Sequence, residues 1–223
     1  MTVDSALIVA GGSHGHDFPA TAQALAGVLG DHGLAVDIVD EPDEAWAAML
    51  ERPEPYGMLA VNGLRFGMTH PRYDALRDRW AYRTPPAADA ALDRHLAAGS
   101  SVFSVHTGCI CFDDWDRWSR VLGRQWSWDE QRLSWHPELA PIRVEPAESL
   151  GDAFQIVDEV YTDMIDLSDV DVLARCSGQP VVWTRHEAAS RVGVTTVGHG
   201  VDTYENDSYR RLLDGLVGWL VNG

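Results

Sequence analysis

Short apolar runs and helical periodicities alternate along the first half of the chain. Such runs, bounded by turn residues, are typical of strands buried on both faces of a parallel sheet. We predict strands at Ala6–Ala10, Ala35–Val39, Gly57–Val61 and Ser101–Val105. We predict the intervening helices, from apolar spacing and from Gly and Pro at their ends, at residues 19–31, 41–50, 86–98 and 112–122. This alternation fits a flavodoxin-like, doubly wound, mostly parallel sheet with helices on both faces.

The second half of the chain has strand after strand without long helices. We predict strands at Ile142–Glu145, Phe154–Tyr161, Val170–Arg175, Val181–Arg185 and Val192–Val197. Turn signals separate them, so extra antiparallel strands should extend the sheet. An amphipathic helix at residues 206–221 closes the chain. We find no repeat or linker, and therefore expect residues 1–223 to form a single domain.

Charge and composition narrow the classes of partner. The chain has 34 acidic and 17 basic residues, for a formal charge of −17, and every basic residue is Arg. A surface with this much negative charge repels phosphate groups. We therefore expect no nucleic-acid partner and no docking on anionic membranes. The absence of Lys excludes Schiff-base chemistry on a side chain. Three cysteines make no disulfide framework, and no apolar stretch reaches the roughly 20 residues that span a bilayer. These features predict a cytoplasmic protein.

Histidines and carboxylates follow several of the predicted strands. In open α/β sheets, ligands bind beyond the carboxyl ends of the strands. His106 ends an apolar strand at the place where a nucleophile elbow would lie, and a neutral imidazole there can serve as a base or as a metal ligand. Glu159 lies on a mostly apolar strand, where a carboxylate needs a partner. Side chains alternate along a strand, so Tyr161 should lie on the same face as Glu159. We expect Asp158 to lie at a solvated strand edge.

Two chemical interpretations of these residues stay open. His16, His106, Glu159 and His199 offer the nitrogen and oxygen ligands of a catalytic divalent metal such as zinc. Their spacing matches no local metal-binding motif, and a metal-free His106–Glu159 acid–base pair fits equally well. Ordinary polar loop positions are expected for four other histidines, His32, His95, His136 and His186.

Several other residues of types that can carry chemistry are expected to have structural roles. Cys109 and Cys111 fall in the predicted helix after His106 and are expected to be small buried residues, as is Cys176. The glycine-rich run at residues 11–15 lacks the GxGxxG pattern, so we predict no dinucleotide site. Nine tryptophans are present, and most should pack in the core. Because Trp126 and Trp128 alternate around Ser127, one of the two could face a cleft and stack on a sugar ring.

Three segments in this order resemble the ThuA-like (trehalose utilisation) family of the class I glutamine amidotransferase-like superfamily. They are VFSVHTGCICFDDWDRWSRVLG, DEVYTDMIDLSDVDVLA and the closing region from QPVVW to the final helix. The resemblance implies an amidotransferase-like fold without the nucleophilic cysteine, with His106 in the corresponding region. It also implies a role in carbohydrate metabolism, on disaccharides such as trehalose or their keto-derivatives. The pocket positions that it carries over are His16, His106, Glu159, Tyr161 and His199. The chain departs from the family pattern at residues 185–193 and at Gly108-Cys109.

The first functional hypothesis is therefore an enzyme acting on a sugar or keto-sugar, as a hydrolase, lyase or isomerase. His106 would be base or ligand, Glu159 its partner, and Tyr161 and His199 proton donors or positioning groups. The alternative is a non-catalytic scaffold that binds a sugar or a protein partner. A third hypothesis is a cysteine hydrolase using Cys109 or Cys111. A homo-oligomer is compatible with this fold class.

Overall fold

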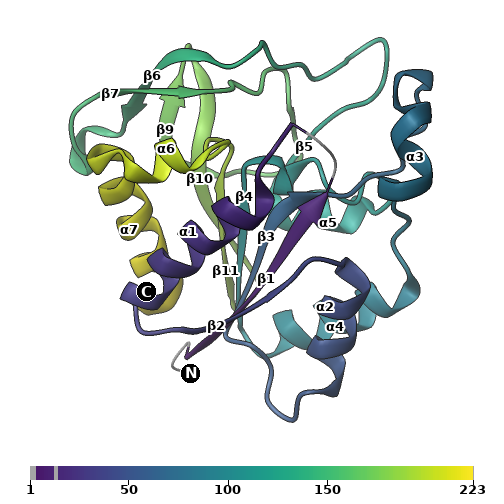
Figure 1. The fold of residues 1–223 in the computed structure, drawn as a ribbon. Coiled ribbons are helices and arrows are strands. Elements are labelled where there is room, and N and C mark those ends of the chain that lie inside the picture. The colour runs from purple at the N-terminus through teal and green to yellow at the C-terminus, as the bar shows by residue number, and fades with distance from the viewer. Residues whose placement is uncertain (1–3, 13–14, 223) are drawn as a thin grey trace.

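Nine strands form one mixed sheet in the computed structural model, which describes residues 4–12 and 15–222 (Figure 1). The strand order is β2-β1-β3-β4-β11-β10-β9-β6-β7. The parallel part contains β2 (Ala35–Val39), β1 (Ser5–Gly12), β3 (Met58–Leu64), β4 (Ser101–Val105) and β11 (Ser190–Thr195). The antiparallel part contains β10 (Gln179–Glu187), β9 (Asp171–Cys176), β6 (Ala140–Pro146) and β7 (Phe154–Asp158). The parallel part has the order of a flavodoxin-like sheet, which confirms the predicted fold class.

Helices cover both faces of the parallel strands. One face carries α1 (Phe18–Asp31), α6 (Val201–Glu205) and α7 (Asp207–Asn222), and the other carries α2 (Pro42–Glu51), α4 (Pro86–Ala97) and α5 (Asp116–Leu122) (Figure 1). Successive residues of each strand point to opposite faces, so Ile8 packs into one core and Leu7 into the other. In Figure 1, α3 (Asp74–Trp80) stands at the side of the molecule, and none of its residues is fully buried.

The segment after β4 differs from the prediction. The predicted helix at residues 112–122 begins only at Asp116. A short 3₁₀ helix, His106–Cys109, comes first, and Phe112 then has a left-handed backbone with φ of 59°. That conformation interrupts helical hydrogen bonding and is unusual for a bulky residue. Cys109 therefore lies in the 3₁₀ helix and Cys111 in the following turn, instead of in one continuous helix.

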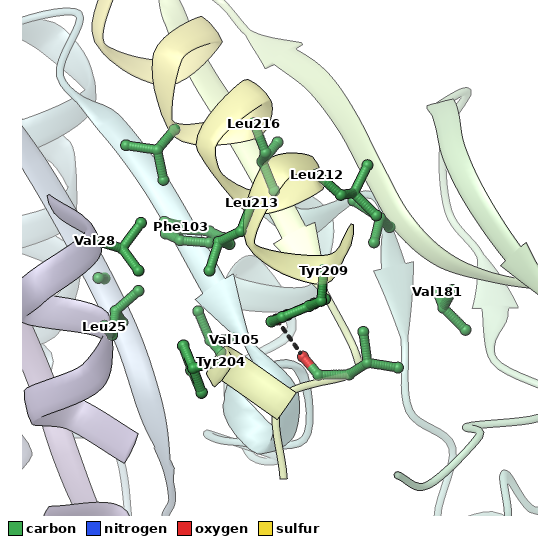
Figure 2. Close-up of a cluster of buried hydrophobic side chains, with 14 of the residues drawn as sticks. Leu25, Val28, Phe103, Val105, Val181, Tyr204, Tyr209, Leu212, Leu213 and Leu216 are labelled. Carbon is green, nitrogen blue, oxygen red and sulfur yellow. Dashed lines mark hydrogen bonds between the residues drawn. The ribbon is translucent and has the colours of Figure 1, made fainter. Parts of the chain in front are cut away.

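The helix α7 packs against β4 and β11 and contacts the segment that follows β11. Figure 2 shows Leu213 of α7 beside Phe103 of β4, whereas Leu212 lies on the side of the helix toward Val181. The Tyr209 hydroxyl donates a hydrogen bond of 2.9 Å to the Val197 carbonyl (Figure 2). A buried carbonyl needs such a partner, so this bond fixes the chain just before residues 198–200. Among residues 4–12 and 15–222, no helix is long and apolar enough to cross a membrane.

Candidate functional site

The four candidate ligands follow four different strands that end on the same side of the sheet. His16 comes after β1, His106 after β4, Glu159 after β7 and His199 after β11. The strands β1, β4 and β11 are parallel. Successive antiparallel pairings from β11 through β10, β9 and β6 return β7 to the same direction. The carboxyl ends therefore bring together residues that are far apart in sequence.

The side chains of these residues meet in one cluster. One ligand atom from each of His16, His106, Glu159 and His199 lies within 4.8 Å of all the others. The Nε2 atoms of His16 and His106 are 3.1 Å apart. Glu159 Oε2 lies 3.7 Å from His106 Nε2, and Glu159 Oε1 lies 3.9 Å from His199 Nε2. The structure thus assembles the four residues that the sequence singled out as metal ligands.

His106 occupies a sharp, strained turn directly after β4. Its φ is 49°, a left-handed conformation that non-glycine residues rarely adopt and that clusters at functional sites. The turn lies close against β3, because Thr107 Oγ1 donates to the Gly63 carbonyl at 2.6 Å. His106 Nδ1 lies 2.9 Å from the Thr196 carbonyl. A carbonyl can only accept, so Nδ1 carries the proton and Nε2 presents its lone pair to the cluster.

Tyr161, the remaining catalytic candidate, is fully buried against His106. Its hydroxyl lies 3.3 Å from His106 Nε2. The strand β7 ends at Asp158, so Glu159 and Tyr161 share the site through the loop that follows the strand, and not through strand alternation as predicted. Burial raises the pKa of Tyr161 well above its usual range, so the hydroxyl stays protonated and can donate a hydrogen bond.

The expectation of a solvated Asp158 is wrong. Its side chain is completely buried. Oδ2 accepts from the backbone N–H of Gly198 at 2.8 Å, from that of His199 at 3.2 Å, and from Thr203 Oγ1 at 2.9 Å. Oδ1 accepts from the Glu159 N–H at 2.9 Å. One carboxylate therefore ties the backbones of both Glu159 and His199, and it acts as a positioning group for two members of the cluster.

Burial shifts the protonation of the cluster. Removal from water lowers the pKa of His106 to about 3 and also lowers the pKa of His199. Burial, and next the negative charge of Asp158, raise the pKa of Glu159 to about 7. Desolvation disfavours the charged form of each group, which explains why the two imidazoles and the carboxyl move in opposite directions. The lowered pKa keeps His106 and His199 neutral, which is the form that binds metals.

The donor set fits a divalent transition metal. Zinc takes imidazole nitrogens at about 2.0–2.1 Å and carboxylate oxygens at about 2.0–2.2 Å, usually in a tetrahedron. Donor atoms at the corners of such a tetrahedron lie roughly 3.4 Å from one another, by geometry from those bond lengths. Three of the observed separations, 3.1, 3.7 and 3.9 Å, lie near that value, and one donor atom from each of the four residues lies within 4.8 Å of the others. The Thr196 carbonyl orients His106 in the way that outer groups orient metal-ligating histidines.

A cavity of about 330 Å³ opens beside the cluster. His16, Glu159 and Tyr161 line its inner end. Aromatic residues form much of the rest, namely Phe66, Tyr73, Trp126, Trp128 and Trp135. We expected one of Trp126 and Trp128 to face a cleft, and the structure differs in that both tryptophans line this cavity. A larger cavity, of about 510 Å³, lies near Gly57 and Ser101 at the other ends of the strands, away from the cluster.

His136 is a residue of the site that sequence reasoning missed. It was expected to be an ordinary loop histidine, but its Nδ1 lies 3.4 Å from Glu159 Oε2 and it lines the cavity. Its loop has no periodicity to reveal this position. His95 also departs from the loop expectation, because it is buried in α4 with Nε2 2.8 Å from the Ser101 carbonyl. That contact is structural and lies outside the cluster.

The cysteines have the buried character that the sequence predicted. Cys109, Cys111 and Cys176 are all free and buried. Burial raises the pKa of Cys109 and raises that of Cys111 to about 12. Thiolates are the reactive form, so these thiols lack the lowered pKa of a catalytic cysteine. The geometry gives no support to the cysteine hydrolase hypothesis.

Fold and site together define a doubly wound α/β protein with a strained histidine directly after its fourth strand and a cluster of three histidines and a glutamate at the carboxyl ends of the strands. The chain belongs to the ThuA family, described as trehalose utilisation, whose model matches residues 5–220. None of the curated proteins matches the chain in sequence.

Similar solved structures agree with this fold. A ThuA-like protein from Parabacteroides merdae is 16% identical with a TM-score of 0.71, covering 100% of this chain and 91% of that chain. A ThuA-like protein from Bacteroides uniformis is 15% identical with a TM-score of 0.66, covering 99% and 92%. PurLQS from Thermotoga maritima is 12% identical with a TM-score of 0.53, covering 99% and 100%. At these identities the likeness concerns the fold alone.

Proposed function

We propose that this protein is an enzyme of carbohydrate metabolism that binds one divalent transition metal and acts on a sugar or keto-sugar. His16, His106, Glu159 and His199 would hold the ion, with zinc the first choice for this set of nitrogen and oxygen donors. The observation that carries the proposal is the convergence of these four groups from four strand ends to within 4.8 Å. The Thr196 carbonyl supports it by fixing the tautomer of His106.

The bound ion would supply Lewis-acid polarisation of a substrate carbonyl or hydroxyl oxygen. The protein's own residues supply the proton transfers. One oxygen of Glu159 would bind the ion, and its other oxygen could then take a proton from a carbon next to a carbonyl in the cavity that Glu159 and His136 line. The Tyr161 hydroxyl, kept protonated by burial, can donate to the oxygen on which negative charge develops.

The cavity beside the cluster suits an uncharged, polyhydroxylated substrate. Aromatic faces stack on the C–H groups of sugar rings, and five aromatic residues besides Tyr161 line this cavity. The formal charge of −17 disfavours anionic substrates. The family match, described as trehalose utilisation, supports the same substrate class.

A metal-free acid–base pair is the second candidate for the mechanism. The observation that favours it is the carboxyl of Glu159, whose pKa of about 7 lies close to the working pH that suits a general acid or base. In that case Glu159 and Tyr161 would perform the same proton transfers without an ion. Metal content separates the two candidates.

The test is elemental mass spectrometry on protein that carries no His-tag. We expect about one zinc or similar ion per chain in the wild type, and a clear loss in both His199→Ala and Glu159→Gln. The exposed His186, which packs on Trp219 away from the cluster, gives a matched control. His186→Ala should retain the ion. A wild type that binds no ion after incubation with zinc, manganese or cobalt would overturn the metal proposal.

Turnover then separates the enzyme from a binding scaffold. If Glu159→Gln and Tyr161→Phe abolish conversion of keto-sugars that the wild type converts, the enzyme proposal stands. Saturable sugar binding without turnover, unchanged in these variants, would instead establish the non-catalytic scaffold.

A further inference from the structure

The strands β2 and β7 lie at the two ends of the nine-stranded sheet that residues 4–12 and 15–222 form. An outermost strand presents backbone N–H and C=O groups with which another strand can pair, and proteins commonly guard such an edge with charge. The edge at β2 is guarded in this way, because Asp37 lies in the middle of the strand. Its carboxylate accepts a hydrogen bond of 2.7 Å from the Tyr56 hydroxyl and lies 3.8 Å from Arg52 Nη1.

The middle of β7, at the opposite edge, carries no charge. Its residues there are Gln155, Ile156 and Val157. Gln155 is exposed, and Val157 is 57% exposed although it is a β-branched apolar residue. Uncharged outer strands with exposed apolar residues are the places at which separate chains pair.

The backbone groups of Gln155 and Val157 point out from this edge. Asn206, between α6 and α7, donates from Nδ2 to the Gln155 carbonyl at 3.2 Å, so that carbonyl is turned away from β6. In an antiparallel pair, successive residues direct their backbone groups alternately toward the partner strand and away from it. Val157, two residues further on, therefore also directs its N–H and carbonyl outward, whereas Ile156 faces its partner Ile142 on β6.

This arrangement is complementary to itself. When two copies of β7 lie antiparallel about a two-fold axis through Ile156, Gln155 of each copy lies opposite Val157 of the other. Each of these two pairs exchanges two backbone hydrogen bonds, so the contact contains four. An axis perpendicular to the sheet also keeps Phe154 and Ile156 of both copies on the same, inner face. A two-fold contact of this kind closes on itself and gives a dimer.

Charge favours this edge over most of the surface. Each copy has a formal charge of −17, so two copies repel each other wherever acidic groups face one another. Gln155 and Val157 carry no charge across the axis. On β6, Arg143 is the cross-strand neighbour of Gln155, and its Nε lies 3.6 Å from Glu145 Oε1, so these two charges offset each other.

We propose that this protein forms a two-fold dimer in which β7 of one copy pairs antiparallel with β7 of a second copy. The two nine-stranded sheets then continue into one another. The strand contact is small, so monomer and dimer exchange in the micromolar range of concentration. The pairing goes beyond the proposed function and requires neither the ion nor a substrate. Because β7 ends at Asp158, which binds the backbone of Glu159 and His199, the pairing also holds the strand that leads into the cluster.

The test is sedimentation equilibrium of the full chain from about 1 to about 300 μM, at about 0.15 M and about 0.5 M salt. We expect a reversible monomer–dimer equilibrium that tightens at the higher salt, because salt screens the repulsion between the copies. Val157→Pro removes an outward N–H and no bond to β6, so it should stay monomeric throughout. Val157→Thr keeps this N–H and the β-branched shape, and this matched control should retain the dimer.

A pair of introduced charges tests the register. Val157→Glu should weaken the dimer about tenfold, because the two-fold axis makes each substitution count twice. Adding Gln155→Arg should restore it, since opposite charges then face each other across the axis. Urea unfolding should show Val157→Glu with and without Gln155→Arg equally stable, so that their difference in association reports on the contact alone.

Three results would overturn the proposal. The first is a wild type that remains monomeric at every concentration and at both salt concentrations. The second is a Val157→Pro variant that dimerises as the wild type does. The third is a Val157→Glu variant whose association Gln155→Arg does not restore, because the two positions would then not lie opposite each other.

Discussion

The close contact between Gly108 and β3 makes a small substitution informative. Gly108 lies in the 3₁₀ helix that carries His106, and a Cβ added to it would lie 2.3 Å from the Val61 carbonyl oxygen and 2.9 Å from Ser104 Oγ. Ordinary van der Waals contact begins near 3.4 Å. The obstacle at 2.3 Å is backbone in the centre of the sheet, so it cannot rotate away. Gly108→Ala must therefore move the 3₁₀ helix outward by about 1 Å.

The expected cost follows from that displacement. Overpacking a tight core costs about 1–3 kcal/mol, and a backbone obstacle places this site in the upper part of the range. The same movement shifts His106 relative to Glu159 and His199. A misplacement of about 1 Å in a catalytic group can reduce activity about 100-fold, and ion binding depends on the same distances.

Urea unfolding and ion content measured on the same preparation test this reasoning. We expect Gly108→Ala to lose about 2–3 kcal/mol of unfolding free energy and to bind the ion at least tenfold more weakly. Gly27 is the matched control, because it is exposed in α1 and its added Cβ would meet nothing within 4 Å. Gly27→Ala should gain about 0.5–1 kcal/mol from helix propensity and keep the ion. Equal stability and equal ion affinity for Gly108→Ala and the wild type would refute the argument.

Two further predictions concern buried groups. Burial lowers the pKa of His95 from 6.5 to about 4. As the pH falls from 6.5 to 4, the unfolded chain therefore binds a proton at this histidine and the folded chain does not. The free energy of unfolding should fall by about 3 kcal/mol across that range. Urea unfolding at several pH values should show this loss reduced in His95→Gln, and an unchanged slope would contradict the assignment. Burial also raises the pKa of Cys109 and Cys111. Iodoacetamide at pH 8 should therefore label neither thiol until urea unfolds the chain, and peptide mass spectrometry measures the labelling. Labelling of the native protein within minutes would contradict this prediction, because it would show an accessible thiolate.

The parallel half of the fold is readable in the sequence because its strands are buried on both faces. The run at Ser101–Val105 is apolar throughout apart from two serines, and the predicted bounds agree with β4. The short helices α3 and α6 were missed, since five to seven residues give too little periodicity. The helix α5 begins later than predicted because Phe112 has a left-handed backbone. Phenylalanine does not favour that conformation, so the sequence at this position does not predict it.

The candidate site was predictable to the extent that strand ends are predictable. His106 and His199 follow apolar strands, and the carboxyl-end rule places them together. Asp158 was assigned to the wrong environment, although the alternation of buried Phe154 and Ile156 with exposed neighbours puts it on the inner face. His136 lies in an irregular connection and Tyr73 in a 3₁₀ helix of three residues, and neither segment is long enough in regular structure for sequence spacing to predict distance in space.

The position of β11 has a consequence for synthesis of the chain. It follows all the other described strands in the chain, yet it lies between β4 and β10 and pairs with both. Until residues 190–195 emerge, the nascent protein has two separate sheets with unpaired inner edges, and such edges invite misassembly. Translation that stops before β11 should therefore yield a chain prone to aggregation, which a chaperone would have to hold until residues 190–195 have been synthesised.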